Sequence, residues 1–239
     1  MLVILTAALL PAILLFIYVW KKDAKPEPTS QLVKAVLWGI GICIPVAFLE
    51  LFISGMLFGA IEPSSLFGAT INAFCVAALP EEACKLLALW IVLRKNPYYD
   101  EHYDGIVYAV CVGLGFAAVE NIMYVFGADD WMSVAISRAL LAVPGHYAFA
   151  VIMGYYYSLY HFVDHSDSNK WRILIMPFLA HGIYDTLVMS ISINPLIGVL
   201  AFCILIYFCI KMHKAANGRI RQLIEKDKAI AQDNLVQDN

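Results

Sequence analysis

Charged residues are scarce in this chain. Asp, Glu, Lys and Arg make up 15% of its 239 residues, whereas hydrophobic residues make up 62%. An ordinary soluble domain contains about 25% charged and about 45–50% apolar residues. This balance excludes a soluble globular domain. It indicates a membrane protein with room for one polytopic bundle.

Three common sequence signals are also missing. The six cysteines lie in apolar runs without C-x-x-C or C-x-x-H spacing, so neither a disulfide framework nor a zinc finger is supported. No basic region precedes the first apolar run, residues 1–20, which we therefore expect to be a retained helix rather than a secretory signal. No internal repeat is visible, which counts against transporter folds built from duplicated halves.

Long apolar runs dominate the rest of the chain. A helix needs about 20 residues to cross the hydrocarbon of a bilayer. Runs of roughly this length cover residues 2–20, 31–54, 68–93, 105–127, 132–161, 172–191 and 195–211. The sequence therefore predicts an all-α, polytopic membrane helix bundle of about seven transmembrane helices. We expect residues 1–211 to form this bundle and residues 212–239 to form a cytosolic C-terminal tail.

The loops between these runs alternate in charge. Lys and Arg gather at residues 21–25, 94–95 and 170–172 and from residue 211 onward. Loops 55–67, 128–131 and 192–194 contain no Lys or Arg, and their charged residues are Glu62, Asp129 and Asp130. Cytoplasmic loops of membrane proteins carry an excess of basic residues. The pattern predicts an N-terminus outside and a C-terminus inside.

Strongly polar residues occur inside the apolar spans. A charge at membrane depth costs roughly 2.5–3.5 kcal/mol on insertion scales, so such residues indicate a functional site. Counted at a rise of 1.5 Å per residue, they lie roughly 15–24 Å from the inner ends of four spans. We therefore expect them to meet around a shared hydrated pocket. The predicted site residues are Glu81, Glu82, Lys85, Glu120, Asn121, His146, His181 and Asp185.

Spacing within single helices predicts two local pairs. Lys85 is three residues from Glu82 and four from Glu81, so its ammonium can pair with either carboxylate on one helix face. His181 and Asp185 are four residues apart, and an aspartate in that position can hold an imidazole in one orientation.

Three further positions have less specific expectations. Pro144-Gly145, directly before His146, predicts a kink or a break in the fifth span. Arg138 is expected to extend towards the outer face or to be ion-paired. Glu50, near the end of the second span, is assigned a structural role.

Three chemistries fit these groups. In the first, a desolvated glutamate activates a water and the histidines stabilise an oxyanion. In the second, Glu81, His146 and His181 form a His2Glu set with an open position for one Zn²⁺. In the third, the same carboxylates and histidines relay protons or ions in a channel or transporter.

Four motifs, one in each of four spans, resemble the PrsW family of bacterial intramembrane proteases, which is related to the CAAX-prenyl endopeptidase and Abi superfamily. They are PEEACK (80–85), DEHYDGIVYAVCVGLGFAAVENIMYV (100–125), PGHYAFAVIMGYYY (144–157) and LAHGIYD (179–185). The family's motif positions fall on Glu81, Glu82, Lys85, Phe116, Glu120, His146, His181 and Asp185.

CAAX-type relatives carry E-E-x-x-x-R and F-x-x-x-H where this chain has E-E-x-x-K and F-x-x-x-E. Their metal-free glutamate mechanism is therefore not carried over intact, and both the metal-free and the metal-dependent reading stay open.

The resemblance implies an endopeptidase of the bacterial plasma membrane. Its substrate would be a single-pass, membrane-anchored anti-sigma factor that receives a first, site-1 cut on the outer side, which leads to release of a sigma factor in the envelope-stress response. Glu81 is the expected general base, tuned by Glu82 and Lys85. His146 and His181 would stabilise the oxyanion or bind metal, while Asp185 orients His181. Glu120 and Asn121 would complete the cavity. The expected surroundings are the lipid bilayer, with no nucleic-acid partner.

Overall fold

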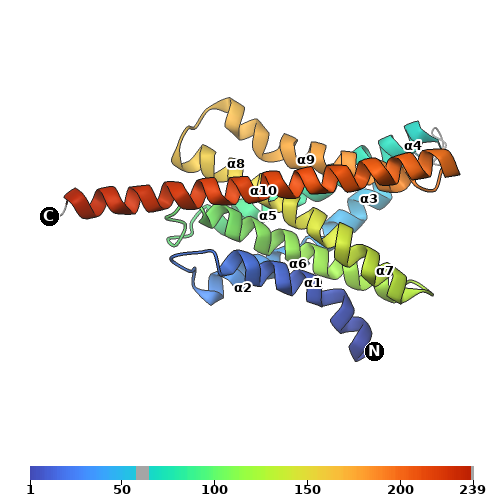
Figure 1. The fold of residues 1–239 in the computed structure, drawn as a ribbon, viewed down its shortest axis with the longest axis horizontal. Coiled ribbons are helices and arrows are strands. Elements are labelled where there is room, and N and C mark those ends of the chain that lie inside the picture. Colours follow the sequence, from blue (N-terminus) through green and yellow to red (C-terminus); the bar gives the residue numbers. More distant parts are fainter. Residues whose placement is uncertain (58–64, 238–239) are drawn as a thin grey trace.

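The computed structural model describes residues 1–57 and 65–237, and the regular structure in these ranges is entirely helical. Glu62, in one of the loops predicted to face outward, lies outside the described residues. Figure 1 shows the helices in sequence colours. In chain order the elements are α1 (Leu2–Trp20), α2 (Thr29–Gly41), α3 (Cys43–Leu57), α4 (Leu66–Ile71), the π-helix η1 (Asn72–Ala78), α5 (Leu79–Leu93), α6 (Asp104–Phe126), α7 (Trp131–Ser137), the π-helix η2 (Arg138–Ala142), α8 (Val143–Phe162), α9 (Asp167–Ser190) and α10 (Pro195–Gln237).

The predicted all-α polytopic membrane bundle is confirmed. Within the described ranges, six helical stretches are long and apolar enough to cross a bilayer: Leu2–Trp20, Thr29–Leu57, Asp104–Phe126, Trp131–Phe162, Asp167–Ser190 and Pro195–Val236. The remaining predicted span, 68–93, corresponds to the consecutive helices α4, η1 and α5. This stretch is not among the six, and it carries three charged residues, Glu81, Glu82 and Lys85.

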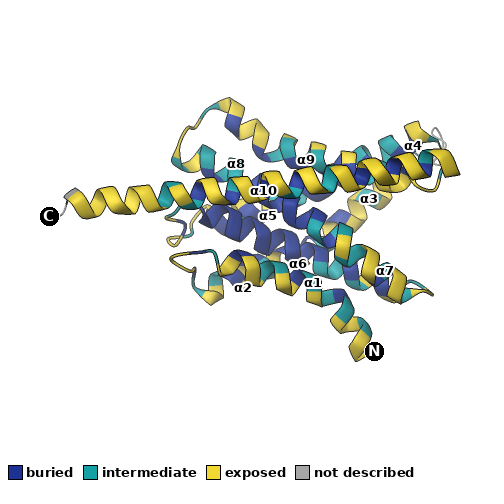
Figure 2. Cartoon of the chain, in the orientation of Figure 1, coloured by how far each residue is buried: buried dark blue, intermediate teal, exposed yellow. Residues whose placement is uncertain are grey.

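Helix α6 forms the centre of the bundle. Its first half, from Asp104 to Ala117, is buried on every side (Figure 2), and α6 packs against α1, α2 and α8. The approach is close because glycines replace larger side chains at the contacts. A Cβ on Gly39 of α2 would lie 2.1 Å from the carbonyl oxygen of Val112, and one on Gly154 of α8 would lie 2.3 Å from that of Gly105. Small residues of this kind let membrane helices touch backbone to backbone.

Helix α10 extends along the whole bundle and continues beyond it (Figure 1). Its membrane part exposes large apolar side chains such as Leu196, Val199 and Ile210, which suits a lipid-facing surface. The same helix continues without interruption through residue 212, where the cytosolic tail was predicted to begin. Ile220 and Leu223 are fully buried, so this part of the helix packs against the bundle.

In Figure 1 the C-terminus marks one end of the long axis, and the N-terminus lies towards the other end. An odd number of membrane crossings, such as the seven predicted, puts the two termini on opposite sides of a bilayer. Which end faces the cytoplasm is not determined by the fold, and the outside N-terminus stays a prediction from the loop charges.

Candidate active site

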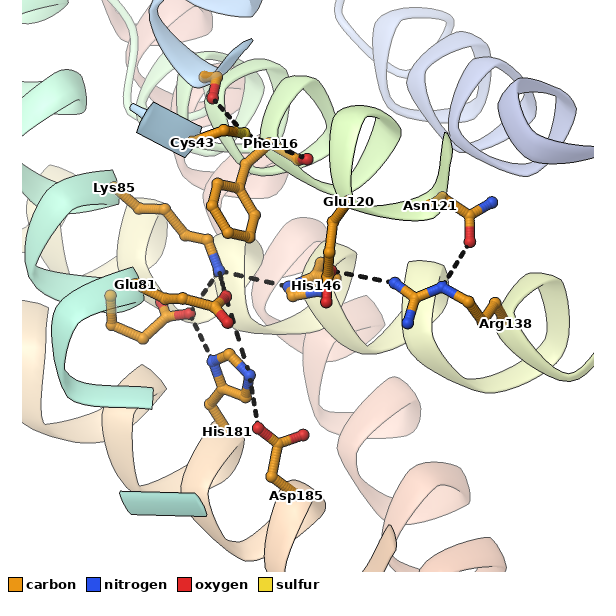
Figure 3. Close-up of polar contacts among 12 residues, drawn as sticks. Cys43, Glu81, Lys85, Phe116, Glu120, Asn121, Arg138, His146, His181 and Asp185 are labelled. Atoms are coloured by element: carbon orange, nitrogen blue, oxygen red, sulfur yellow. Dashed lines mark hydrogen bonds and ion pairs between the residues drawn. The ribbon is translucent and has the colours of Figure 1, made fainter. Parts of the chain in front are cut away.

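Four helices bring the predicted site residues into one cluster (Figure 3). The ionisable side chains lie in the first two turns of α5 and α8 and in the second half of α6 and α9. Glu81, Glu82 and Lys85 come from α5, Glu120 and Asn121 from α6, His146 from α8, and His181 and Asp185 from α9. The convergence expected from depth along the spans is thus present in the structure.

A π-helix lies directly before each of two helices that carry site residues, α5 and α8. η1 ends directly before α5, which has Pro80 in its first turn, and η2 ends directly before α8, which has Pro144 in its first turn. Proline lacks the N–H that an α-helix would use, and π-turns are frequent where functional sites interrupt regular helix. Helix α8 does not break at Pro144-Gly145, because the chain stays helical and the irregular turns lie at 138–142.

Lys85 lies between the two glutamates of its own helix. Its Nζ donates to Glu81 Oε2 at 2.8 Å and to Glu82 Oε1 at 2.9 Å. The same nitrogen lies 3.3 Å from His146 Nδ1 and 4.4 Å from the centroid of the Phe116 ring. Lys85, Glu81 and Glu82 are all buried, so this ion pair is shielded from solvent and each partner depends on the others for charge compensation.

His181 is held by carboxylates at both ring nitrogens. Nδ1 lies 2.9 Å from Glu82 Oε1, while Nε2 lies 3.2 Å from Asp185 Oδ2 and 3.9 Å from Glu81 Oε2. The ring also stacks on Phe149, with centroids 4.6 Å apart. The predicted Asp185–His181 pair therefore forms, and Glu82 adds a second anchor from another helix.

His146 belongs to a second chain of polar contacts. Its Nε2 lies 2.6 Å from Glu120 Oε2, and Arg138 Nη2 lies 3.0 Å from the same oxygen. Arg138 Nε donates to Asn121 Oδ1 at 2.7 Å, and Asn121 Nδ2 donates to the carbonyl of Ala8 at 2.6 Å. Arg138 is therefore ion-paired inside the bundle, the second of the two expectations for it. The number of residues between Arg138 and the end of its span indicated how deep the residue lies, but it could not identify Glu120 as the ion-pair partner.

The cluster borders a cavity of about 680 Å³. Glu81, Glu120, His146, His181 and Asp185 line it, together with Arg138 and Glu50. Within the described part of the chain, Glu82 and Lys85 are not among its lining residues, so Glu81 is the carboxylate of the Glu-Glu pair that reaches the cavity.

Glu50 is a site candidate to which the sequence interpretation gave only a structural role. It is a lone carboxylate near the end of α3, and its place on the cavity wall depends on how α3 packs against η1 and α5. The available signal was a charged side chain inside an apolar span, which by itself indicates a functional position.

The donor set fits a divalent metal ion. Glu81, His146 and His181 each offer one ligand atom, and these atoms lie within 4.8 Å of one another. Two imidazoles and a carboxylate are a common catalytic zinc set. The Lys85 ammonium lies against two of the same residues, so a cation and a proton-bearing amine would compete for them.

These features define a class of protein. A bundle of membrane-spanning helices borders a cavity that is lined by carboxylates and by histidines held in fixed orientations. This combination is typical of an enzyme that hydrolyses bonds inside a membrane.

The comparison with known proteins gives the family. The sequence profile described as "PrsW family intramembrane metalloprotease" matches residues 27–211, and the chain belongs to this family. Relatives named Protease PrsW support the assignment. That of Oceanobacillus iheyensis is 34% identical over 82% of this chain and 88% of its own length. That of Geobacillus kaustophilus is 33% identical over 78% and 80%. That of Bacillus subtilis is 32% identical over 92% and 97%.

No solved structure matches the chain. The family assignment decides between the enzymatic interpretation and the channel or transporter in favour of the enzyme. The protein is an intramembrane peptidase and a multi-pass protein of the bacterial cell membrane.

Proposed function

We propose that this peptidase makes the site-1 cut in a single-pass, membrane-anchored anti-sigma factor, so that a sigma factor is later released for an envelope-stress response. The family resemblance supports the substrate class. The observation that carries the chemistry is the position of Glu81, whose carboxylate lines the cavity between His146 and His181.

Glu81 acts as the general base in this proposal. It takes a proton from a water in the cavity, and the resulting hydroxide attacks the carbonyl carbon of the scissile peptide bond. The tetrahedral intermediate carries its negative charge on the former carbonyl oxygen, where His181 and His146 stabilise it. Glu81 then returns the proton to the leaving nitrogen as the C–N bond breaks.

The surrounding groups hold these residues in position. Glu82 and Asp185 hold the two nitrogens of His181, and Phe149 stacks on its ring. Glu120 holds His146 from the other side, with Arg138 and Asn121 behind it. Pre-oriented groups of this kind contribute to catalysis because little reorganisation is left for the reaction step.

A metal ion is the second form of the same site. Glu81, His146 and His181 would hold one Zn²⁺, which when bound supplies a Lewis acid and lowers the pKa of a coordinated water. The role of Glu81 differs between the two forms, since it is a ligand in one and the base in the other. Metal content therefore separates them.

The depth of the site favours a cut away from the inner surface. Glu81 lies roughly 20 Å along the helix from Arg94, at 1.5 Å per residue. With the orientation predicted from loop charge, this depth supports a cavity in the middle to outer half of the bilayer.

The experiment is cleavage of a single-pass anti-sigma factor by the purified protein in proteoliposomes. Glu81→Gln and His181→Ala are expected to lower the cleavage rate at least 100-fold, since each removes a group that acts on the reacting atoms. Glu225→Gln changes an exposed carboxylate on α10 and is the matched control. Thermal unfolding of each variant distinguishes lost chemistry from lost structure. Full cleavage by folded Glu81→Gln and His181→Ala would contradict the proposal.

A further inference from the structure

Five acidic residues gather at the end of the bundle opposite the cavity. Asp23 and Glu27 lie between α1 and α2, Asp100 and Glu101 precede α6, and Asp104 is the first residue of α6. We refer to these five residues as the loop acid cluster. It is separate from the peptidase site, because Asp104 and Glu120 stand roughly 24 Å apart along α6 at 1.5 Å per residue.

The carboxylates of the cluster form two overlapping triads. Asp23, Glu101 and Asp104 offer one set of oxygens within 4.8 Å of one another, and Glu27, Asp100 and Asp104 offer another. Oxygens that bind one Ca²⁺ do so at about 2.3–2.6 Å, so two of them are at most about 5 Å apart. Both triads meet this limit and share Asp104.

Two oxygens of the cluster are buried without a hydrogen-bond donor. Asp104 is 0% exposed, and its Oδ2 accepts from the backbone N–H groups of Asp100 and Glu101, while its Oδ1 has no hydrogen-bond donor in the described residues and the Glu27 carboxyl group lies within hydrogen-bonding reach of the Asp104 side chain. Asp23 is 8% exposed, and its Oδ1 accepts from the N–H of Lys25, while its Oδ2 likewise lacks a donor. Buried carboxylate oxygens normally find a donor or a cation.

Positive side chains nearby do not balance the cluster. Lys25 Nζ lies 2.5 Å from Asp100 Oδ2, and both side chains are largely exposed. His102 pairs with Asp227 of α10 instead. Glu27 accepts a hydrogen bond from the Tyr108 hydroxyl at 2.6 Å. Burial and the neighbouring carboxylates still raise the pKa of Glu27 above its ordinary value.

We propose that the loop acid cluster binds one hard divalent cation through Asp23, Glu101 and Asp104, since Asp100 pairs with Lys25 and Glu27 accepts from Tyr108. Ligands that are all carboxylate oxygens select Ca²⁺, Mg²⁺ or Mn²⁺ over the softer metals that prefer nitrogen and sulfur. Bound there, the cation joins the α1–α2 connection to the loop before α6. It therefore stabilises the central helix at the end remote from the peptidase site.

The test measures binding of CaCl₂, MgCl₂ or MnCl₂, each alone, to the purified full-length protein in detergent, by titration calorimetry and by thermal unfolding. Wild type is expected to bind one cation per chain and to unfold at a higher temperature when it is bound. Asp23→Asn and Glu101→Gln are each expected to weaken binding at least tenfold. Neither changes the Asp104 contacts to the backbone, so both variants are expected to fold.

Asp164→Asn is the matched control, because Asp164 is an exposed acid in the loop between α8 and α9. It is expected to bind the cation like wild type. Two results would overturn the proposal. One is the absence of binding by all three cations to folded wild type. The other is equal binding by wild type, Asp23→Asn and Glu101→Gln. If lowering the pH raises the unfolding temperature and none of the three cations binds, the carboxyl groups share protons and do not hold a cation.

Discussion

Lys85 is the residue whose contacts would differ most between the metal-free and the metal-bound peptidase site. Its ammonium contacts Glu81, Glu82 and the Nδ1 side of His146, two of which are also candidate metal ligands. A lysine carries a compact charge on a flexible stem, so it can move aside from its partners without disturbing the backbone. Removing it altogether would leave Glu82 buried with one fewer partner, and such losses cost about 3–5 kcal/mol.

At the scale of single residues, zinc content separates the two forms of the peptidase site. If the metal form operates, protein purified from zinc-containing medium carries close to one zinc per chain, and His181→Ala loses most of it because it removes one of three ligands. Elemental analysis measures the zinc directly. His165→Ala changes an exposed histidine and is expected to keep the metal. Chelator-resistant cleavage by metal-free wild type would instead assign the reaction to Glu81 alone.

Contacts within one helix were predictable and contacts between helices were not. The Glu81–Lys85 and His181–Asp185 pairs follow from a spacing of four residues. The contacts of Glu82 with His181, and of Glu120 with His146 and Arg138, join different helices. They depend on the rotation of each helix about its axis, which spacing along one chain segment does not determine.

The helix pair α2–α6 shows how the bundle achieves its close packing. Gly39 and Gly115 leave no room for a side chain, since a Cβ on either would lie within 2.4 Å of a backbone oxygen of the other helix. Gly41, two residues further along the chain, has nothing within 4 Å of its Cβ position. These neighbours provide a matched pair of substitutions.

Gly39→Ala is expected to destabilise the protein, because the added methyl group must push α2 away from α6. Overpacking of this kind typically costs about 1–3 kcal/mol. Gly41→Ala is expected to be neutral or to stabilise by up to about 1 kcal/mol, since alanine is the better helix former. Thermal unfolding in detergent compares the two. Equal unfolding temperatures for both variants would contradict the packing described for α2 and α6.

Of the two π-helices, the sequence indicated a disturbed helix near only one. Pro144-Gly145 indicated a disturbed helix before His146, and the structure places a π-helix at 138–142. The longer π-helix at 72–78 was not anticipated, although Pro80 follows it. A proline reports a missing donor, but whether the chain kinks, breaks or widens into a π-turn depends on which neighbours pack beside it.

Helix α10 connects distant parts of the molecule. Asp227, near its end, accepts from the backbone N–H of His102 at 2.9 Å and of Tyr103 at 2.8 Å, and its Oδ1 lies 2.6 Å from His102 Nδ1. These contacts secure the loop directly before α6. Burial of Ile220 and Leu223 holds the same helix against the bundle.

Asp227→Ala is therefore expected to lower the unfolding temperature of the whole protein. It leaves two backbone donors and an imidazole without their acceptor, and an unsatisfied buried donor costs about 1–3 kcal/mol. Asp233→Ala, on an exposed position of the same helix, is expected to have no effect. Thermal unfolding of both variants is the measurement. If Asp227→Ala unfolds like wild type, the contacts of Asp227 with the loop before α6 contribute nothing to stability.

Composition and order along the chain were sufficient to predict a polytopic helical membrane protein whose polar residues meet at a common level along the helices. Partition into a bilayer depends on the apolar content of each segment, and depth follows from counting residues along a helix. Only the packed bundle determines that Glu81 rather than Glu82 reaches the cavity, that Arg138 pairs with Glu120, and that Glu50 joins the wall. Those outcomes depend on how helices rotate and pack together, and that is decided by all of their contacts at once.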